Sequence, residues 1–229
     1  MPDVHVEAND FWMPRGLPVL TSNNEWEMAA IEEAKLGESV GFLPKNEREE
    51  VVSWWLAVRG RANTPNWDIA STCTIRGKLG LLLVEAKAHR AELKPDGKTL
   101  SKNVSAGSEM NQKQICSAIR AASAGLETAM QGWKLSCESH YQLANRFAWS
   151  WKFASIGRPI VLVYLGFLGA KEMSGLGEPF TDQDHWSHVV LEYSRNIVPN
   201  QAWGRDLNIG SVAIRPLIRS CEHGLPTVT

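Results

Sequence analysis

The sequence has no clear excess of charge of either sign, because 24 lysines and arginines nearly balance 25 aspartates and glutamates. Such a chain is not coated in basic surface, although a near-neutral total does not exclude nucleic acid. The balance conceals an asymmetry, since residues 1–60 carry 5 basic and 11 acidic side chains while residues 61–229 carry 19 and 14. Nine of the basic residues lie between Arg76 and Arg120, against four acidic ones. The second part of the chain is therefore the part suited to a polyanion.

Long apolar runs are also missing, and without a run of about 18 such residues we expect no transmembrane helix and no membrane partner. The chain begins without the basic and then apolar segment of a secretory signal. Its four cysteines show no CxxC spacing, which favours free thiols in a reducing compartment, and its histidines lack the spacing of a zinc helix. We predict a cytoplasmic protein without zinc.

What is present is enough for one hydrophobic core. The chain has 229 residues, of which 44% are hydrophobic, and we predict a single domain over residues 1–229. Within it we expect a core at residues 44–168, an N-terminal arm and helix at residues 1–43, and a C-terminal extension at residues 169–229.

The most informative stretch covers residues 67–87, where two apolar runs flank Arg76 and Gly77. This pattern predicts a β-hairpin with a two-residue turn, in which Ile75 faces Lys78 and Asp68 faces Glu85. Directly opposed residues point to the same side of a sheet with their Cβ atoms roughly 5 Å apart, and the period of two places Lys87 there as well. The hairpin is therefore expected to bring two carboxylates and one ammonium together.

Two carboxylates at such a distance repel each other and raise each other's pKa unless a cation lies between them. A divalent metal ion would supply that cation, and carboxylate oxygens at a partly solvated position suit Mg²⁺ or Mn²⁺. Lys87 would then hold a phosphate oxygen or orient a water molecule. An exposed hairpin with a cross-strand charge pair is the alternative interpretation.

Asp68, followed after a strand-length gap by Glu85-Ala86-Lys87 at the end of an apolar strand, resembles the PD-(D/E)XK nuclease superfamily. This is the fold of many restriction enzymes and Holliday-junction resolvases. In the superfamily a proline often precedes the aspartate, but here Asn66-Trp67 stands between Pro65 and Asp68, so Pro65 lies one residue earlier than in the pattern. The resemblance implies an α/β fold with a restriction endonuclease-like αβββαβ core, in which helices flank a mixed central sheet. It also implies that the acidic pair binds the catalytic metal and that the lysine assists the attacking water.

Two helices are expected before the hairpin, at residues 25–37 and at residues 44–59, with Gly60 closing the second. Members of the superfamily often place a glutamate near the metal from the helix that precedes the hairpin. Glu47 is the first candidate for this metal-binding role and Glu49 is the next. A solvated acidic first turn, favoured by the helix dipole, is the alternative for each.

The segment after the hairpin is polar, basic and broken by Pro95-Asp96-Gly97, so it is expected to be a long loop that is mobile without substrate. Basic residues in it would contact the substrate backbone: Arg90, Lys94, Lys98 and Lys102. The alternative is a solvated surface excursion.

Two more helices are expected, at residues 108–125 and 138–156. On the second, Gln142, Asn145 and Arg146 share one face. Gln142 and Arg146 are candidates for gripping phosphates or orienting the metal ligands, since some superfamily members carry a glutamine motif on the helix after this strand. An ordinary helix surface is the alternative.

The last elements are predicted from shorter patterns. Residues 160–168 form an unbroken apolar run, which predicts a central strand buried on both faces. Residues 40–43, or a strand that is not recognised, would complete the strand count. Residues 182–195 are expected to be helical, and residues 211–219 to form a strand that Pro216 confines to an edge.

The resemblance implies a magnesium-dependent, or manganese-dependent, endonuclease-like phosphodiesterase that acts on DNA. Restriction-type enzymes need a dimer for double-strand cuts, so a homodimer stays open. Asp68 and Glu85 would bind the metal, with the Ala86 carbonyl as a further ligand, and Lys87 would orient or deprotonate the water. Two other functions stay open: a non-catalytic nucleic-acid or protein interaction module on the same fold, and a metal-dependent hydrolase of a small phosphate ester. The second fits the modest net charge better.

Overall fold

The computed structural model describes residues 3–14, 18–20, 26–28, 34–37, 41–59, 63–100 and 104–222. The α-helices are α1 (Lys45–Trp55), α2 (Ala106–Ala129), α3 (Tyr141–Ser155) and α4 (Gln183–Tyr193). The strands are β1 (Val4–His5), β2 (Trp12–Met13), β3 (Pro18–Leu20), β4 (Trp26–Met28), β5 (Ala34–Lys35), β6 (Asn66–Trp67), β7 (Ile69–Ile75), β8 (Lys78–Lys87), β9 (Ile160–Leu168), β10 (Leu207–Ile209) and β11 (Val212–Glu222). Short 3₁₀ helices are η1 (Arg90–Glu92), η2 (Lys171–Met173) and η3 (Asn200–Ala202).

One mixed sheet organises the described part of the chain. Its strand order is β1-β7-β8-β9-β11-β10, and β2 also pairs with β7. Strand β9 runs parallel to both of its neighbours, β8 and β11, whereas β7 and β10 are antiparallel to theirs. The expected α/β class with a mixed central sheet is confirmed, and so is the central position of the apolar run at Ile160–Leu168.

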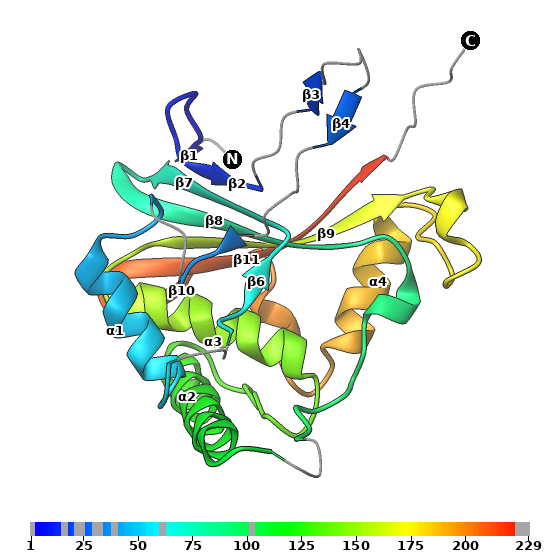
Figure 1. Cartoon of the computed structure of the whole chain (residues 1–229). Helices are drawn as coiled ribbons and strands as arrows, with labels where there is room; N and C mark the ends of the chain where they lie inside the picture. The colour runs from blue at the N-terminus through cyan, green and yellow to red at the C-terminus, as the bar shows by residue number, and fades with distance from the viewer. Residues whose placement is uncertain are drawn as a thin grey trace.

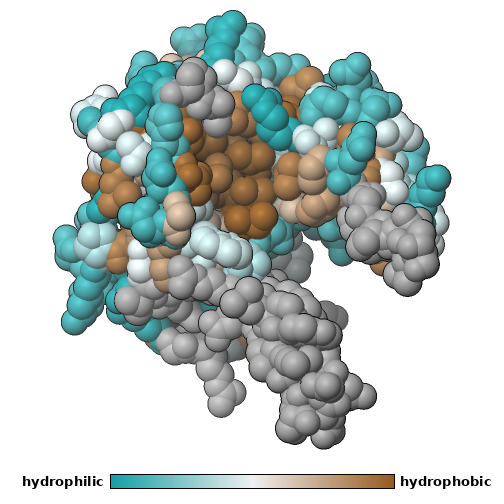
Figure 2. Space-filling model, turned by 90° about the horizontal axis from the view of Figure 1, so that it is seen from above, coloured by the Kyte–Doolittle hydropathy of each residue, from teal (hydrophilic) through white to brown (hydrophobic). Residues whose placement is uncertain are grey.

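The α-helices lie on one face of this sheet (Figure 1). Helices α3 and α4 pack against β9 and β11, α2 packs against α3, and α1 packs against α2. The main apolar core lies between these layers and includes Leu83, Phe147 and Leu162. A smaller apolar cluster around Val161 and Leu217 lies on the opposite face of the sheet. Figure 2, which views the molecule from above Figure 1, shows hydrophobic side chains gathered on that opposite side.

The predicted hairpin register is confirmed from Ile75↔Lys78 to Ile69↔Val84. The turn residues Arg76 and Gly77 both have positive φ, at 50° and 75°, as the tight type I′ hairpin turn requires. Asp68 lies one residue beyond the last regular pair, between the short strand β6 and β7.

The helix expected at residues 25–37 is wrong where the structure describes it. Strand β4 pairs with β3, β5 pairs with β6, and residues 36–37 form a turn, while residues 25 and 29–33 lie outside the described residues. Ala34 is completely buried and pairs with the equally buried Trp67, so tertiary contacts override helix propensity. Residues 41–43 form turns instead of the expected early strand, and Val40 lies outside the described residues.

The C-terminal ends of two helices differ from the prediction by four residues, and a distant element makes contact near each of them. Helix α1 ends at Trp55, and Asn111 of α2 bonds both the N–H and the C=O of Val58, so the backbone after the helix has partners. Helix α2 continues past Gly125 to Ala129, and Gly125 lies against Trp151. A Cβ atom at this glycine would lie 2.1 Å from the indole nitrogen of Trp151, so only glycine admits this contact.

The expectation of free cysteines is wrong for two of the four. Cys116 of α2 and Cys137, which precedes α3, form a disulfide with their Cα atoms 5.4 Å apart, while Cys73 and Cys221 are free. The cysteines are 21 residues apart in sequence, and no short motif announces their pairing. The cytoplasmic location stays a prediction, and the disulfide removes one argument for it, which was the expectation that all four cysteines are free thiols.

Reduction of this disulfide is expected to lower the free energy of unfolding by about 3 kcal/mol, because an open loop of this length restores entropy to the unfolded chain. Chemical denaturation with and without a phosphine reductant measures the difference. A Cys116→Ser/Cys137→Ser variant should match the reduced protein and should no longer respond to the reductant. Equal midpoints for the oxidised and reduced wild type would contradict the expectation.

The residues expected to form a C-terminal extension are part of the main sheet. Helix α4, which confirms the helix predicted there, packs on β9 and β11, and β11 lies beside β9. Strand β10 pairs with β11 only at residues 212–214. Beyond them, at Pro216, the side of β11 that faces away from β9 has no strand partner among the described residues. None of the helices in the described part has the length and apolar character needed to cross a bilayer.

Candidate active site

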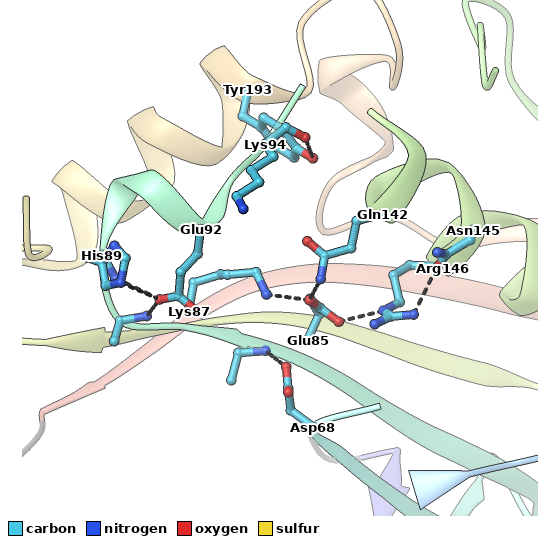
Figure 3. Close-up of polar contacts among 12 residues, drawn as sticks. Asp68, Glu85, Lys87, His89, Glu92, Lys94, Gln142, Asn145, Arg146 and Tyr193 are labelled. Carbon is cyan, nitrogen blue, oxygen red and sulfur yellow. Dashed lines mark hydrogen bonds and ion pairs between the residues drawn. The ribbon is translucent and has the colours of Figure 1, made fainter. Parts of the chain in front are cut away.

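A cavity of about 700 Å³ opens beside the C-terminal end of β8, between the hairpin, the segment after it and the start of α3. Its charged lining residues are Asp68, Glu85, Lys87, Glu92, Lys94, Asp96 and Arg146. Figure 3 shows most of these side chains converging from separate elements. The structure therefore brings together the three residues predicted from the hairpin, Asp68, Glu85 and Lys87, with residues of α3.

Glu85 is the centre of this cluster and is only 1% exposed. Lys87 and Gln142 donate hydrogen bonds to its Oε1 atom, the latter at 2.5 Å, and the Nε atom of Arg146 donates to its Oε2 atom. A buried carboxylate requires such partners, because an ion removed from water without them costs several kcal/mol. The charge of Glu85 is thus compensated within the chain.

Arg146 acts on Glu85 from a fixed position. Its guanidinium lies 4.6 Å from the ring centre of Trp67 and donates a further hydrogen bond to Asn145 at 2.8 Å. The side chain is 8% exposed. These contacts hold Arg146 toward the glutamate, so orienting Glu85 is the role its geometry supports better than gripping substrate.

Asp68 approaches the cluster from the position between β6 and β7, directly before the strand that pairs with β8. Its Oδ2 atom accepts the Ala86 N–H at 2.7 Å, a contact that replaces the regular strand pair at this point. Since the N–H and C=O of one residue in a strand point the same way, the Ala86 carbonyl also faces Asp68. Two carboxylates and one carbonyl therefore lie around the end of β8, but the predicted direct pairing of Asp68 with Glu85 is absent from the register, which ends at Ile69↔Val84.

The pKa of Asp68 is raised above its ordinary value of 3.8, first by loss of water around the carboxylate and second by the negative charge of Glu85. The residue is exposed at the rim, but its carboxylate points inward toward Ala86, which reconciles exposure with desolvation. The hydrogen bond from the Ala86 N–H lowers this pKa, and the positive charges of Lys87 and Arg146 lower it further, but burial and Glu85 outweigh them.

Replacing Asp68 with asparagine is therefore expected to stabilise the metal-free protein slightly at neutral pH. A raised folded-state pKa means that the folded chain holds its proton more tightly, so stability falls as pH rises from 3.8 through the folded pKa. The gain from Asp68→Asn should be largest above this window and vanish in acid. Thermal melts in chelator across pH measure it, and a variant less stable at neutral pH would contradict the raised pKa.

The other predicted residues divide into two groups. Gln142, Arg146 and Lys94 line the cavity, whereas Lys98 does not and instead places its ammonium 4.8 Å from the ring centre of Tyr141. Burial lowers the pKa of Lys98. Arg90 pairs with Glu192 at 2.7 Å.

The structure corrects the metal role expected for Glu47. Both of its carboxylate oxygens accept hydrogen bonds from Arg158, at 2.7 and 2.8 Å, and it is not among the residues that line the cavity. Glu49 pairs loosely with Lys45 at 3.9 Å. Helix α1 therefore contributes Trp55 to the cavity wall and no carboxylate.

Where the structure describes it, the loop after β8 makes backbone hydrogen bonds to other parts of the chain at several points. Arg90 N–H bonds the Glu178 carbonyl, and Lys98 N–H bonds the Cys137 carbonyl at 2.7 Å. Asp96 forms an isolated antiparallel β-bridge with Ser139, which lies just before α3. Lys102 lies outside the described residues, and the expected mobility stays a prediction.

Glu92 and Asp96 are site residues that the sequence patterns did not single out. Glu92 accepts the N–H groups of Ala88 and His89, at 2.7 and 3.1 Å, and so closes the turn that follows Lys87. A carboxylate five residues after Lys87 in a polar loop carries no periodic signal. The tight turn of η1 is what brings it back to the cavity.

The residues at the end of β8 offer oxygen atoms of the kind that a magnesium ion binds. Mg²⁺ is commonly held by one or two carboxylates and several waters, and Asp68, Glu85 and the Ala86 carbonyl offer such oxygens. Lys87 would have to turn away from Glu85, whose Oε1 atom already accepts two hydrogen bonds. Within the described residues, no group of three or more histidine, cysteine, aspartate and glutamate side chains has the arrangement of a metal site.

Comparison with protein-family models, with curated proteins and with solved structures finds no match to this chain. The likeness to PD-(D/E)XK nucleases therefore rests on the residues of the hairpin and on α3.

Proposed function

We propose that the protein is a metal-dependent phosphodiesterase that hydrolyses DNA, on a core of α1, β7, β8, α3 and β9 that corresponds to the restriction endonuclease-like core with one strand fewer. The observation that carries the proposal is the convergence of Asp68, Glu85 and Lys87 on one cavity, with Gln142 and Arg146 directed at Glu85. A purely structural hairpin has no need for an aspartate beside a buried glutamate.

Each residue has a distinct task in this proposal. Asp68 and Glu85 would hold the metal, which when bound lowers the pKa of water and offsets charge on the phosphate. Arg146 and Gln142 fix the orientation of Glu85 by their hydrogen bonds. Lys87, once it turns from Glu85, reaches into the cavity with a positive charge that orients the attacking water or a phosphate oxygen.

A small phosphate ester is the second candidate substrate, and the cavity itself favours it. The lining has four acidic and three basic side chains, so it is not a basic groove of the kind that tracks a polyanion. Its volume of about 700 Å³ lies within the range typical of small-molecule sites. A non-catalytic interaction module has no comparable observation in its favour.

Calorimetric titration with Mn²⁺, paired with a nicking assay on supercoiled plasmid, tests the proposal. Metal binding together with metal-dependent nicking is the expected result. A protein that binds Mn²⁺ but cuts no form of DNA would transfer the proposal to small phosphate esters, which chromogenic phosphodiesters would then report. Binding of neither metal nor DNA would exclude both candidates.

A further inference from the structure

The disulfide between Cys116 and Cys137 joins two segments that both hold the loop after β8. The N–H of Lys98, in that loop, donates to the Cys137 carbonyl at 2.7 Å. The side chain of Gln112, one turn before Cys116 on α2, donates to the Lys98 carbonyl at 2.9 Å. Both backbone polar groups of Lys98 are therefore bound by residues next to the disulfide.

A seam of backbone hydrogen bonds joins residues 94–98 to residues 137–141. Besides the bond just described, the N–H of Tyr141 donates to the Asp96 carbonyl at 2.9 Å, and the N–H of His140 donates to the carbonyl of the preceding loop residue at 2.8 Å. The two backbones touch, because a Cβ atom at position 97 would lie 2.3 Å from a carbonyl oxygen of the other segment. The disulfide therefore fixes one side of this seam to α2.

Side chains that line the candidate active site come from both sides of the seam. Lys94 and Asp96 line the cavity from the loop, and Tyr141 and Gln142 line it from the start of α3. Gln142 also donates the hydrogen bond to Glu85 at 2.5 Å. Separation of the two segments would thus widen the cavity and withdraw a partner of Glu85.

We propose that the disulfide is a redox-sensitive clamp on the candidate active site, which a dithiol opens by reducing it. A thiolate of the dithiol attacks the sulfur of Cys116, which is the more exposed of the two residues, and Cys137, only 8% exposed, leaves as a thiolate that takes up a proton. The second thiol then displaces Cys116 from the mixed disulfide. Two electrons and two protons pass to the protein, and the dithiol becomes a cyclic disulfide. The opening of the seam goes beyond the proposed function, whereas its effect on catalysis rests on that function.

Amide hydrogen exchange, resolved by residue with NMR, tests the clamp without substrate or metal. After treatment with dithiothreitol, the amides of Lys98, His140 and Tyr141 should exchange roughly 10-fold to 100-fold faster, because local opening of the seam is no longer restrained by the cross-link. The amide of Leu81, which bonds the Pro159 carbonyl at 3.0 Å near the other end of β8, is the internal control. Its exchange should change much less.

The double variant Cys116→Ser/Cys137→Ser should show the reduced pattern and no longer respond to dithiothreitol. Cys221→Ser is the matched control, because Cys221 is an exposed free cysteine, and this variant should respond as the wild type does. Circular dichroism verifies the fold, and reduction and reoxidation of the wild type give the same comparison if the double variant does not fold. Unchanged exchange at the three seam amides, or equal acceleration at Leu81, would overturn the inference.

Plasmid nicking with Mg²⁺, compared between oxidised and reduced protein, separates the clamp from the proposed hydrolysis. Nicking should fall by roughly 10-fold or more on reduction, since small displacements of positioning groups are costly in catalysis, and it should return on reoxidation. Equal nicking in both states would show that the clamp does not control the site. Absence of nicking in both states contradicts the hydrolysis alone, because the exchange pattern still decides whether the disulfide holds the seam.

Discussion

Glu85→Ala is expected to lower the free energy of unfolding by about 3–5 kcal/mol, the usual cost of removing one partner from a buried ion cluster. The substitution leaves Lys87 and Arg146, whose side chains are 7% and 8% exposed, without their common counter-charge. It also removes the acceptor of the Gln142 hydrogen bond. Denaturation in urea with chelator present measures the loss, so that metal affinity does not contribute.

The matched control is Glu49→Ala, which removes a carboxylate from a surface pair on α1 and should change stability by no more than about 0.5 kcal/mol. Glu85→Gln should lie between the two, because its amide oxygen can still accept a hydrogen bond but carries no charge. If Glu85→Ala proves as stable as Glu49→Ala, the cluster is not held together by the glutamate. That result would also remove the reason for its fixed orientation.

Lys87→Ala should reduce DNA cleavage by roughly 10²-fold or more, the loss typical of deleting a preorganised charge in an active site. Its affinity for Mn²⁺ should stay equal or rise, because Lys87 is the cation that occupies the Oε1 atom of Glu85. Asp68→Asn and Glu85→Gln should show the reverse pattern and weaken metal binding first. Calorimetry and plasmid nicking on the same preparations separate the two effects.

Lys78→Ala is the control for loss of a lysine from the same strand, since Lys78 lies at the opposite end of β8 and bonds the Ser211 carbonyl. Lys87→Met keeps most of the aliphatic chain, so it distinguishes loss of charge from loss of packing. Normal cutting by Lys87→Ala would show that the role assigned to this lysine is wrong.

The sequence by itself determined the local geometry of the site. Gly77 permits a positive φ, and the two-residue turn allows one register between the flanking apolar runs, so the side on which Glu85 and Lys87 meet followed from residues close in the chain. The spacing of Gln142 and Arg146 placed both on one face of α3 for the same reason. Each of these relations involves one turn or one helix, where backbone geometry leaves few alternatives.

Only the tertiary structure decided which residues from distant parts of the chain reach the candidate site. Glu47 looked like a metal ligand on its own helix, yet it pairs with Arg158, 111 residues away, and leaves the site. The disulfide from Cys116 to Cys137 and the place of β11 beside β9 likewise depend on chain segments that meet only after folding. Glu92 reaches the cavity because its carboxylate satisfies two backbone N–H groups of a tight turn. Such contacts are selected by burial and charge compensation across the whole fold, and no short spacing in the sequence encodes them.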